Sequence, residues 1–104
     1  MKFALIALML ASPASAADLL TLDFDNQSSR VVEAVSVYPM TSAGEIVDDN
    51  IGAIVDPIAP GDSRRLELSL VACGKVWARV NMADGEEITG QTDLCRNQQL
   101  IITD

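Results

Sequence analysis

Hydrophobic and polar side chains alternate along most of this 104-residue chain, in short runs separated by turn residues. A period of two residues is typical of β-strands that bury one face. The predicted strands are residues 18–25, 31–39, 51–55, 63–71, 74–82, 86–94 and 97–103. Their inward-facing side chains are expected to include Leu20, Leu22, Phe24, Leu66, Leu68, Leu70, Leu100 and Ile102. Six or seven strands with a turn signal about every ten residues predict an all-β fold, a small antiparallel β-sandwich.

The segment of residues 31–39 is rich in β-branched side chains, which favours a strand, but its two faces are mixed. Val35 shares a side with Glu33, whereas Val32 lies on the opposite side. Two arrangements explain this pattern. The strand is either central and buried on both faces, or it contains a β-bulge that shifts the alternation.

Two of the predicted strands form a hairpin, and its register follows from the turn at residues 83–85. A three-residue Ala-Asp-Gly loop suits a type I turn followed by a left-handed residue, which Gly adopts without steric cost. The apolar face is then Val76, Ala78, Val80, Met82, Ile88, Gly90, Thr92 and Leu94. The opposite face is Lys75, Trp77, Arg79, Asn81, Glu87, Thr89, Gln91 and Asp93, with Lys75 facing Asp93. A two-residue turn would slip the register by one position and mix the two faces, so we favour the longer loop.

The only two cysteines of the chain are expected to close this hairpin with a disulfide. Cys73 and Cys95 each lie eleven residues from Asp84, so they face one another at the open end of the ladder. Closing a loop of this length adds roughly 3 kcal/mol by the chain-entropy model. A redox-active pair is less favoured because no Cys-x-x-Cys spacing is present, and a zinc site is less favoured because the chain has no histidine.

The N-terminal segment has the composition of a secretory signal peptide. Lys2 precedes an apolar run at residues 3–11, and Ala-Ser-Ala at residues 14–16 matches a small-x-small cleavage site. Nine apolar residues are too few to span a bilayer, which needs about 20. We therefore expect residues 1–16 to be removed and residues 17–104 to form one periplasmic or secreted domain, with no stable membrane insertion after cleavage. Export also explains an oxidised cysteine pair.

The expected domain is strongly acidic. The whole chain has seven basic and fifteen acidic residues and a net charge of −8; without Lys2, six basic residues against fifteen acidic ones leave −9. Such a surface repels nucleic acid and anionic membranes, so neither is expected as a partner. A basic periplasmic protein or a divalent cation fits this charge better.

The composition argues against an enzyme. The chain has no histidine, so the usual general base near neutral pH is missing. It also has no Gly-x-Ser-x-Gly elbow, phosphate-binding loop or dinucleotide fingerprint, and no cofactor is predicted. A pair of carboxylates, as in glycoside hydrolases, is the one catalytic alternative left, which makes a small hydrolase the least favoured class.

Two regions are candidates for binding a protein partner. The first contains Trp77 and Arg79 on the polar face of the hairpin, where an exposed tryptophan ringed by polar groups would be a hot spot for a protein or a glycan. Alternatively, both hairpin faces are partly covered, or Trp77 packs on the disulfide. The second is the loop of residues 40–50, in which Asp48 and Asp49 would dock on a basic groove of a periplasmic enzyme, as in an inhibitor or adaptor.

Calcium is the metal that the sequence fits best, although only weakly. Asp23 and Asp25 lie on one face of the first predicted strand, with Asn26 at its end, and calcium prefers oxygen ligands. The segment does not match an EF-hand loop, because Gln27 and Ser28 stand where a ligand and the glycine should be. No metal site is therefore predicted, and these residues remain weak candidates.

Several short motifs follow one another from Asp23 onward, namely Phe24-Asp25-Asn26, Val35-Ser36-Val37-Tyr38, Pro60-Gly61-Asp62-Ser63, Cys73, Asp84-Gly85 and Asp93-Leu94-Cys95. In this order they resemble a family of small secreted proteobacterial proteins with no assigned activity. The resemblance implies a β-sandwich outside the cytoplasm. That family has an aromatic-Asp pair soon after the first Cys, whereas this chain has Val76-Trp77-Ala78 and lacks the Asp.

Overall fold

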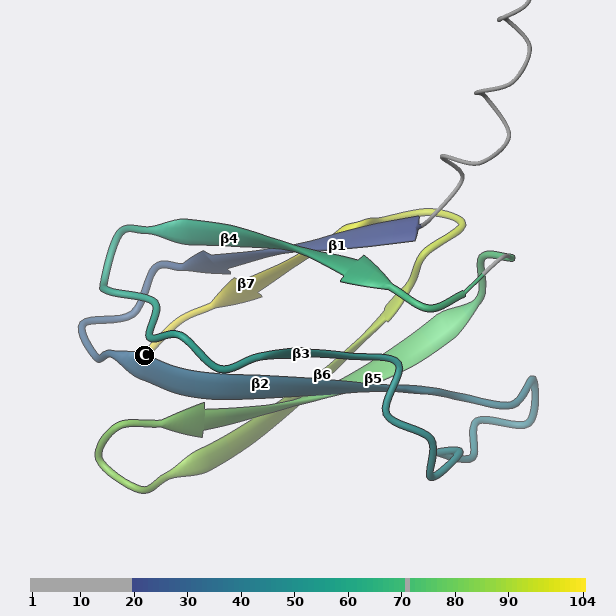
Figure 1. Cartoon of the computed structure of the whole chain (residues 1–104), viewed down its shortest axis with the longest axis horizontal. Coiled ribbons are helices and arrows are strands. Elements are labelled where there is room, and N and C mark those ends of the chain that lie inside the picture. The colour runs from purple at the N-terminus through teal and green to yellow at the C-terminus, as the bar shows by residue number, and fades with distance from the viewer. Residues whose placement is uncertain (1–19, 71) are drawn as a thin grey trace, which may run out of the picture.

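In the computed structural model, which describes residues 20–70 and 72–104, seven β-strands form two packed sheets (Figure 1). The strands are β1 (Leu20–Asn26), β2 (Val32–Pro39), β3 (Gly52–Ile54), β4 (Ser63–Leu68), β5 (Lys75–Met82), β6 (Glu87–Asp93) and β7 (Gln99–Ile102). One sheet has the strand order β4-β1-β7, and the other has the order β3-β2-β5-β6. The predicted β-sandwich of six to seven strands is confirmed, with seven strands. The predicted signal peptide, residues 1–16, lies outside the described residues.

The core lies between the two sheets and contains the side chains that the alternation placed inward. Those that are buried are Leu22, Phe24, Leu68 and Ile102, and those that pack against them at the margin are Leu20, Leu66, Leu70 and Leu100. Ile58, in the connection between β3 and β4, is also fully buried, although no strand was predicted there. Its N–H and C=O groups pair with those of Val32, which anchors this connection to the start of β2. No helix in the described part of the chain is long and apolar enough to cross a membrane.

A β-bulge explains the mixed pattern of the valine-rich segment. The pairing of β2 with β5 shifts between Val32 and Ala34, at the exposed Glu33. Because the bulge adds one residue, Val32 and Val35 both point into the core although they are three positions apart. The bulged alternative is therefore confirmed. β2 is also an interior strand, with β3 on one side and β5 on the other.

The sandwich departs from the expected antiparallel arrangement in one pair of strands. β1 and β7 run parallel, with Phe24 beside Leu100 and Asn26 beside Ile102, whereas every other pair of these strands is antiparallel. The chain leaves β6 in one sheet and enters the other sheet near the start of β1 (Figure 1), so β7 follows the direction of β1. Side-chain alternation is the same in both kinds of pairing, and for this reason the sequence pattern did not indicate the direction.

β4 is shorter than predicted. It ends at Leu68, because the N–H of Ser69 donates to the carbonyl oxygen of Ile51 at 2.9 Å and the chain turns toward the other sheet. Val71, the last residue of the predicted strand, lies outside the described residues.

The β5–β6 hairpin has the predicted register. Lys75 pairs with Asp93, and Trp77 pairs with Gln91. Gly85 has a φ of +97°, and its N–H donates to the carbonyl oxygen of Met82 at 3.0 Å, which closes the turn. An L-residue with a side chain would be strained at this φ. The three-residue loop is thus confirmed.

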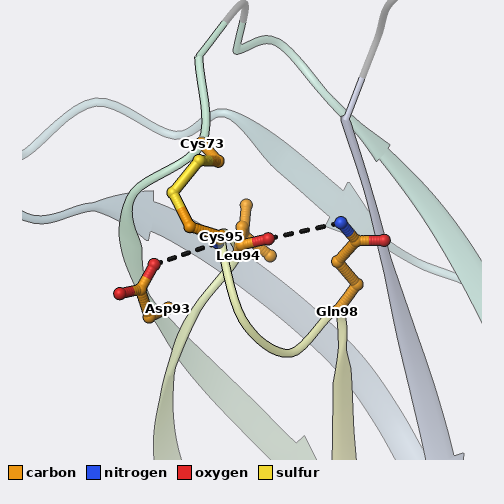
Figure 2. The surroundings of a disulfide bond; sticks show 5 residues. All are labelled: Cys73, Asp93, Leu94, Cys95 and Gln98. Carbon is orange, nitrogen blue, oxygen red and sulfur yellow. Dashed lines mark hydrogen bonds between the residues drawn. A yellow bond between two sulfur atoms is a disulfide. The ribbon is translucent and has the colours of Figure 1, made fainter.

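The predicted disulfide between Cys73 and Cys95 is present at the open end of the hairpin, with Cα atoms 5.1 Å apart (Figure 2). The chain around it is held by two further contacts. The N–H of Cys95 donates to Asp93 Oδ1 at 3.0 Å, and Gln98 Nε2 donates to the carbonyl oxygen of Leu94 at 3.2 Å. The disulfide therefore joins the start of β5 to an ordered turn between β6 and β7.

Asn26, at the end of β1, is a fully buried polar residue whose side chain is saturated with hydrogen bonds. Its Nδ2 donates to the carbonyl oxygens of Arg30 and Ile58 at 2.8 and 3.0 Å. Its Oδ1 accepts from the N–H and the hydroxyl of Ser28 at 3.1 and 2.6 Å. Asn26 therefore fixes the β1–β2 turn and the β3–β4 connection against one another.

Replacing both cysteines, in the variant Cys73→Ser/Cys95→Ser, is expected to lower the free energy of unfolding by about 3 kcal/mol. The disulfide spans 22 residues, and without it the unfolded chain regains the conformational entropy of that loop. Urea denaturation measures the difference. Chemical reduction of the wild type is the matched control and should give the same loss, whereas a variant as stable as the oxidised protein would contradict the prediction.

The variant Asn26→Ala is expected to lose about 2–3 kcal/mol of stability, because it removes all four hydrogen bonds of a buried side chain that joins the β1–β2 turn to the β3–β4 connection. Gln27→Ala is the control. Its side chain is exposed and donates to Asp25, so its removal should change stability by less than about 0.5 kcal/mol. Urea denaturation compares the two variants, and equal stabilities would show that the Asn26 network is not structural.

Candidate functional site

The outward face of the four-stranded sheet carries side chains from three adjacent strands. Because side chains alternate along each strand, the neighbours of the core positions on β2, β5 and β6 point away from the core. The register aligns them in two adjacent rows, Tyr38, Trp77 and Gln91 in the first, and Ser36, Arg79 and Thr89 in the second. The first row lies near the disulfide, because β5 begins two residues after Cys73 and Trp77 is its third residue. The end of β2 and the loop that follows it lie at the same end of the sheet as the start of β5 (Figure 1).

Tyr38, Trp77 and Arg79 form a cluster on this face, which we call the aromatic–arginine cluster. The two rings have centroids 5.8 Å apart and planes inclined at 45°. The guanidinium carbon of Arg79 lies 5.8 Å from the Tyr38 ring centroid and 5.6 Å from that of Trp77, within the range of cation–π attraction. All three side chains remain partly exposed. The positively charged guanidinium of Arg79 thus lies against both rings, on a face of the sheet that no other described strand covers.

The loop of residues 40–50 bounds the cluster on one side. Ile46 and Asp48 line, together with the aromatic–arginine cluster, an open hollow of about 260 Å³, here called the aromatic hollow. The loop is attached to the sheet because the N–H of Val47 donates to the carbonyl oxygen of Pro39 at 2.9 Å. Ile46 is 47% exposed, so its side chain adds apolar surface to the hollow.

Arg79 holds unused hydrogen-bonding capacity at this site. Its Nε is shielded from solvent and makes no hydrogen bond within the described residues. The nearest carboxylate oxygen, Oε2 of Glu87, is 3.6 Å away, which is close enough for an ion pair but too long for a hydrogen bond. Because Nε is closed to solvent while the Arg79 side chain is 41% exposed, a ligand oxygen would have to contact the accessible part of the guanidinium rather than Nε.

The structure brings together three of the four residues predicted to bind a protein partner. Trp77, Arg79 and Asp48 all line the aromatic hollow, although they come from separate predicted regions. Asp49 does not line it; it is exposed, and its N–H donates to the carbonyl oxygen of Val47 at 2.8 Å. Of the alternatives for Trp77, partial cover fits best, since the ring is partly exposed and lies beside Tyr38. That these residues bind a partner stays a prediction.

Sequence reasoning missed Tyr38 and Ile46 as site residues. Tyr38 is the only tyrosine of the chain and directly follows the inward-facing Val37, so the bulged register points it outward. This signal was available once the bulge was assumed. Ile46 lies in a loop without periodicity, and nothing in the pattern indicated that it would reach the sheet.

The weak calcium candidates are not brought together. Asp23 and Asp25 are partly exposed on β1, and the carboxylate of Asp23 accepts a hydrogen bond from Arg65 Nε at 2.8 Å. Asn26 points to the opposite side, where its amide is fully engaged in the core. In the part of the chain that the structure describes, no group of three or more acidic or cysteine side chains is arranged to hold a metal ion.

The residues with shifted pKa values lie away from the aromatic hollow. At the hairpin tip, the carboxylate of Asp84 accepts hydrogen bonds from the N–H of Glu86 at 3.0 Å and from Arg30 Nη1 at 3.2 Å. Both hydrogen bonds lower the pKa of Asp84 below the ordinary 3.8, and the one from Glu86 contributes more. Arg30 also pairs with Glu86 and Asp104, and the contacts with Glu86 and Asp84 raise its pKa. These groups tie the hairpin tip to the β1–β2 turn and the C-terminal residue, which is a structural role.

No family model matches this sequence, and no curated protein matches it. Among solved structures, the chain is similar to the NMR structure of a protein from Eubacterium rectale, with a TM-score of 0.57 and 15% sequence identity over 85% of this chain and 78% of that chain. At this identity the similarity shows the fold alone. Membership of the proteobacterial family that the motifs resemble stays a prediction.

The variant Arg30→Gln is expected to raise the pKa of Asp84 only part of the way toward 3.8, because the larger contribution, the hydrogen bond from the Glu86 N–H, remains. The folded pKa lies below the unfolded one, so this interaction stabilises the fold above about pH 3.8 and is lost as the pH falls through the folded pKa. NMR titration of the Asp84 carboxyl carbon measures the shift. Arg65→Gln, on another strand, is the control and should leave Asp84 unchanged; identical titration in Arg30→Gln would contradict the assignment.

Proposed function

We propose that this protein is an exported, non-catalytic binding module that attaches to a component of the cell envelope through the aromatic hollow. The observation that carries the proposal is the position of the aromatic–arginine cluster on the outer face of the four-stranded sheet. Tryptophan, tyrosine and arginine are the residue types that most often dominate the energy of recognition surfaces.

These two aromatic rings are not part of the hydrophobic core. The core between the sheets is filled by aliphatic side chains and Phe24. The only tryptophan and the only tyrosine of the chain are instead placed side by side at the surface. Both rings are only partly buried, so part of their apolar surface stays in contact with water, and an exposed patch of this kind favours a role in binding.

The other parts of the proposal are supported by the sequence. The predicted signal peptide and the cysteine pair favour a periplasmic or secreted location. The lack of histidine and of known catalytic motifs favours a role without catalysis. The net negative charge disfavours nucleic acid and anionic membranes as binding partners.

A second candidate function is that of an inhibitor or adaptor of a periplasmic enzyme. Its support is that Ile46 and Asp48, from the acidic loop, line the same hollow as Trp77. In this case the loop would enter a basic groove of the enzyme and the aromatic–arginine cluster would pack against the groove's rim. A calcium-binding module has less support, because the candidate residues Asp23 and Asn26 face opposite sides of β1.

Co-sedimentation with an envelope fraction from the source cells tests the proposal. Trp77→Ala is expected to lower the bound fraction about tenfold, because it removes the central apolar contact of the hollow. Lys75→Ala is the matched control, since Lys75 is exposed on the same face of β5 but does not line the hollow.

The double variant Asp48→Asn/Asp49→Asn separates the two functions. Loss of binding in this variant alone favours the docking loop, and loss in Trp77→Ala alone favours the aromatic surface. A folded wild-type protein that does not sediment with the envelope would contradict the proposal.

A further inference from the structure

We infer that the aromatic hollow binds a neutral oligosaccharide, one pyranose ring of which stacks on Trp77 and Tyr38 while its hydroxyl groups bond to Arg79 and Asp48. This inference rests on the proposed function and names the class of ligand. Four features of the hollow lead to it, namely its charge balance, its free donors, its exposed rings and its position on interior strands.

The charges of the hollow favour a ligand without net charge. Arg79 and Asp48 are its only charged lining residues, and Arg79 also pairs with the Glu87 carboxylate at 3.6 Å, so the hollow has no excess of positive charge that would select an anion. A cationic ligand that approached the rings would meet the guanidinium of Arg79, which already lies within 6 Å of both centroids. An anionic ligand would approach a protein with a net charge of −8.

The hydrogen-bonding groups fit a ligand that both donates and accepts. Arg79 offers N–H donors on the accessible part of its guanidinium, because its side chain is 41% exposed although Nε is shielded from solvent. Asp48 offers carboxylate oxygens, which only accept. Adjacent hydroxyl groups of a sugar do both, so one ring can accept from the guanidinium and donate to the carboxylate. Bonds to charged groups are the stronger kind of hydrogen bond.

The two aromatic rings fit the apolar side of a sugar. A pyranose carries C–H groups on its faces and hydroxyl groups around its rim, so it can cover an aromatic ring without burying an unpaired polar group. The partly exposed rings of Trp77 and Tyr38 offer such a surface, and Ile46 extends it. Enclosed binding sites for small molecules usually have a volume of about 300–1,000 Å³. The open hollow of about 260 Å³ is smaller, which suits one ring of a longer chain.

The position of the hollow disfavours an extended peptide. Tyr38 lies on β2 and Trp77 on β5, and each of these strands is paired on both sides. Peptides that recognise β-sheets usually add a strand at an open edge, where backbone groups are unpaired. At the hollow, recognition must therefore come from side chains. Gln91 and Thr89 continue the two rows toward the free edge of the sheet, where further sugar rings can lie.

NMR titration of the ¹⁵N-labelled protein with cellohexaose, chitohexaose and maltohexaose tests the inference. At least one of these neutral sugars is expected to shift, saturably at millimolar concentration, the Trp77 indole N–H and the Arg79 Nε–H. Trp77→Ala and Arg79→Lys should each weaken binding about tenfold, because the first removes the stacking ring and the second keeps the charge but loses the planar donor fork. Lys75→Ala should bind as the wild type does. Absence of shifts at both groups with all three sugars would overturn the inference.

Treatment of the envelope fraction distinguishes this inference from the proposed function. Periodate followed by borohydride cleaves glycans that carry vicinal diols, and lysozyme cleaves chains of 4-linked N-acetylhexosamines, which lack them. The two treatments together should abolish co-sedimentation, whereas protease digestion should leave it intact. If protease digestion abolishes co-sedimentation and the glycan treatment does not, while Trp77→Ala still fails to bind, the partner is a protein. This result would overturn the oligosaccharide inference but support the proposed binding module. If the wild-type protein binds neither the envelope fraction nor any of the sugars, both the oligosaccharide inference and the proposed function would be overturned.

Discussion

The alternation of side chains on β5 is the constraint on which the rest of this molecule depends. Val76, Ala78 and Val80 close the core, and the residues between them, Trp77 and Arg79, are consequently directed to the outer face. The strand can hold this orientation because it is paired on both sides, and because the turn and the disulfide fix its register against β6. A slip by one residue would bury the guanidinium and expose the core, so stability and recognition are linked through one strand.

The two ends of the sandwich are stabilised by different chemistry. At the end with the cysteines, a covalent bond joins β5 to the turn that follows β6. At the opposite end, no disulfide is present among the described residues, and the polar contacts of Asn26 and Arg30 connect three separate segments. The aromatic hollow lies toward the disulfide end, because Tyr38 is near the end of β2 and Trp77 is near the start of β5, which follows Cys73. There a covalent bond adds to the paired strands that support it.

Most of the fold followed from the sequence, because each strand carries its own alternation and the hairpin carries its own turn signal. Three features could not be read in this way. The direction of β7 depends on where the chain enters the sheet, Ile58 contributes to the core from a loop, and Asn26 is recognised as a buried cap only when its partners are known. For the site, Trp77 and Arg79 were identified together on the hairpin, and Asp48 was identified separately in the loop. Their convergence depends on the path of a loop, which local patterns do not encode.

The pairing of Tyr38 with Trp77 also has an optical consequence. These are the only tyrosine and the only tryptophan of the chain, so nearly all of its ultraviolet fluorescence originates at one place on its surface. Ring centroids 5.8 Å apart allow efficient transfer of excitation from the phenol to the indole. The emission of the unlabelled protein therefore reports mainly the surroundings of that one surface, and the molecule contains its own local probe.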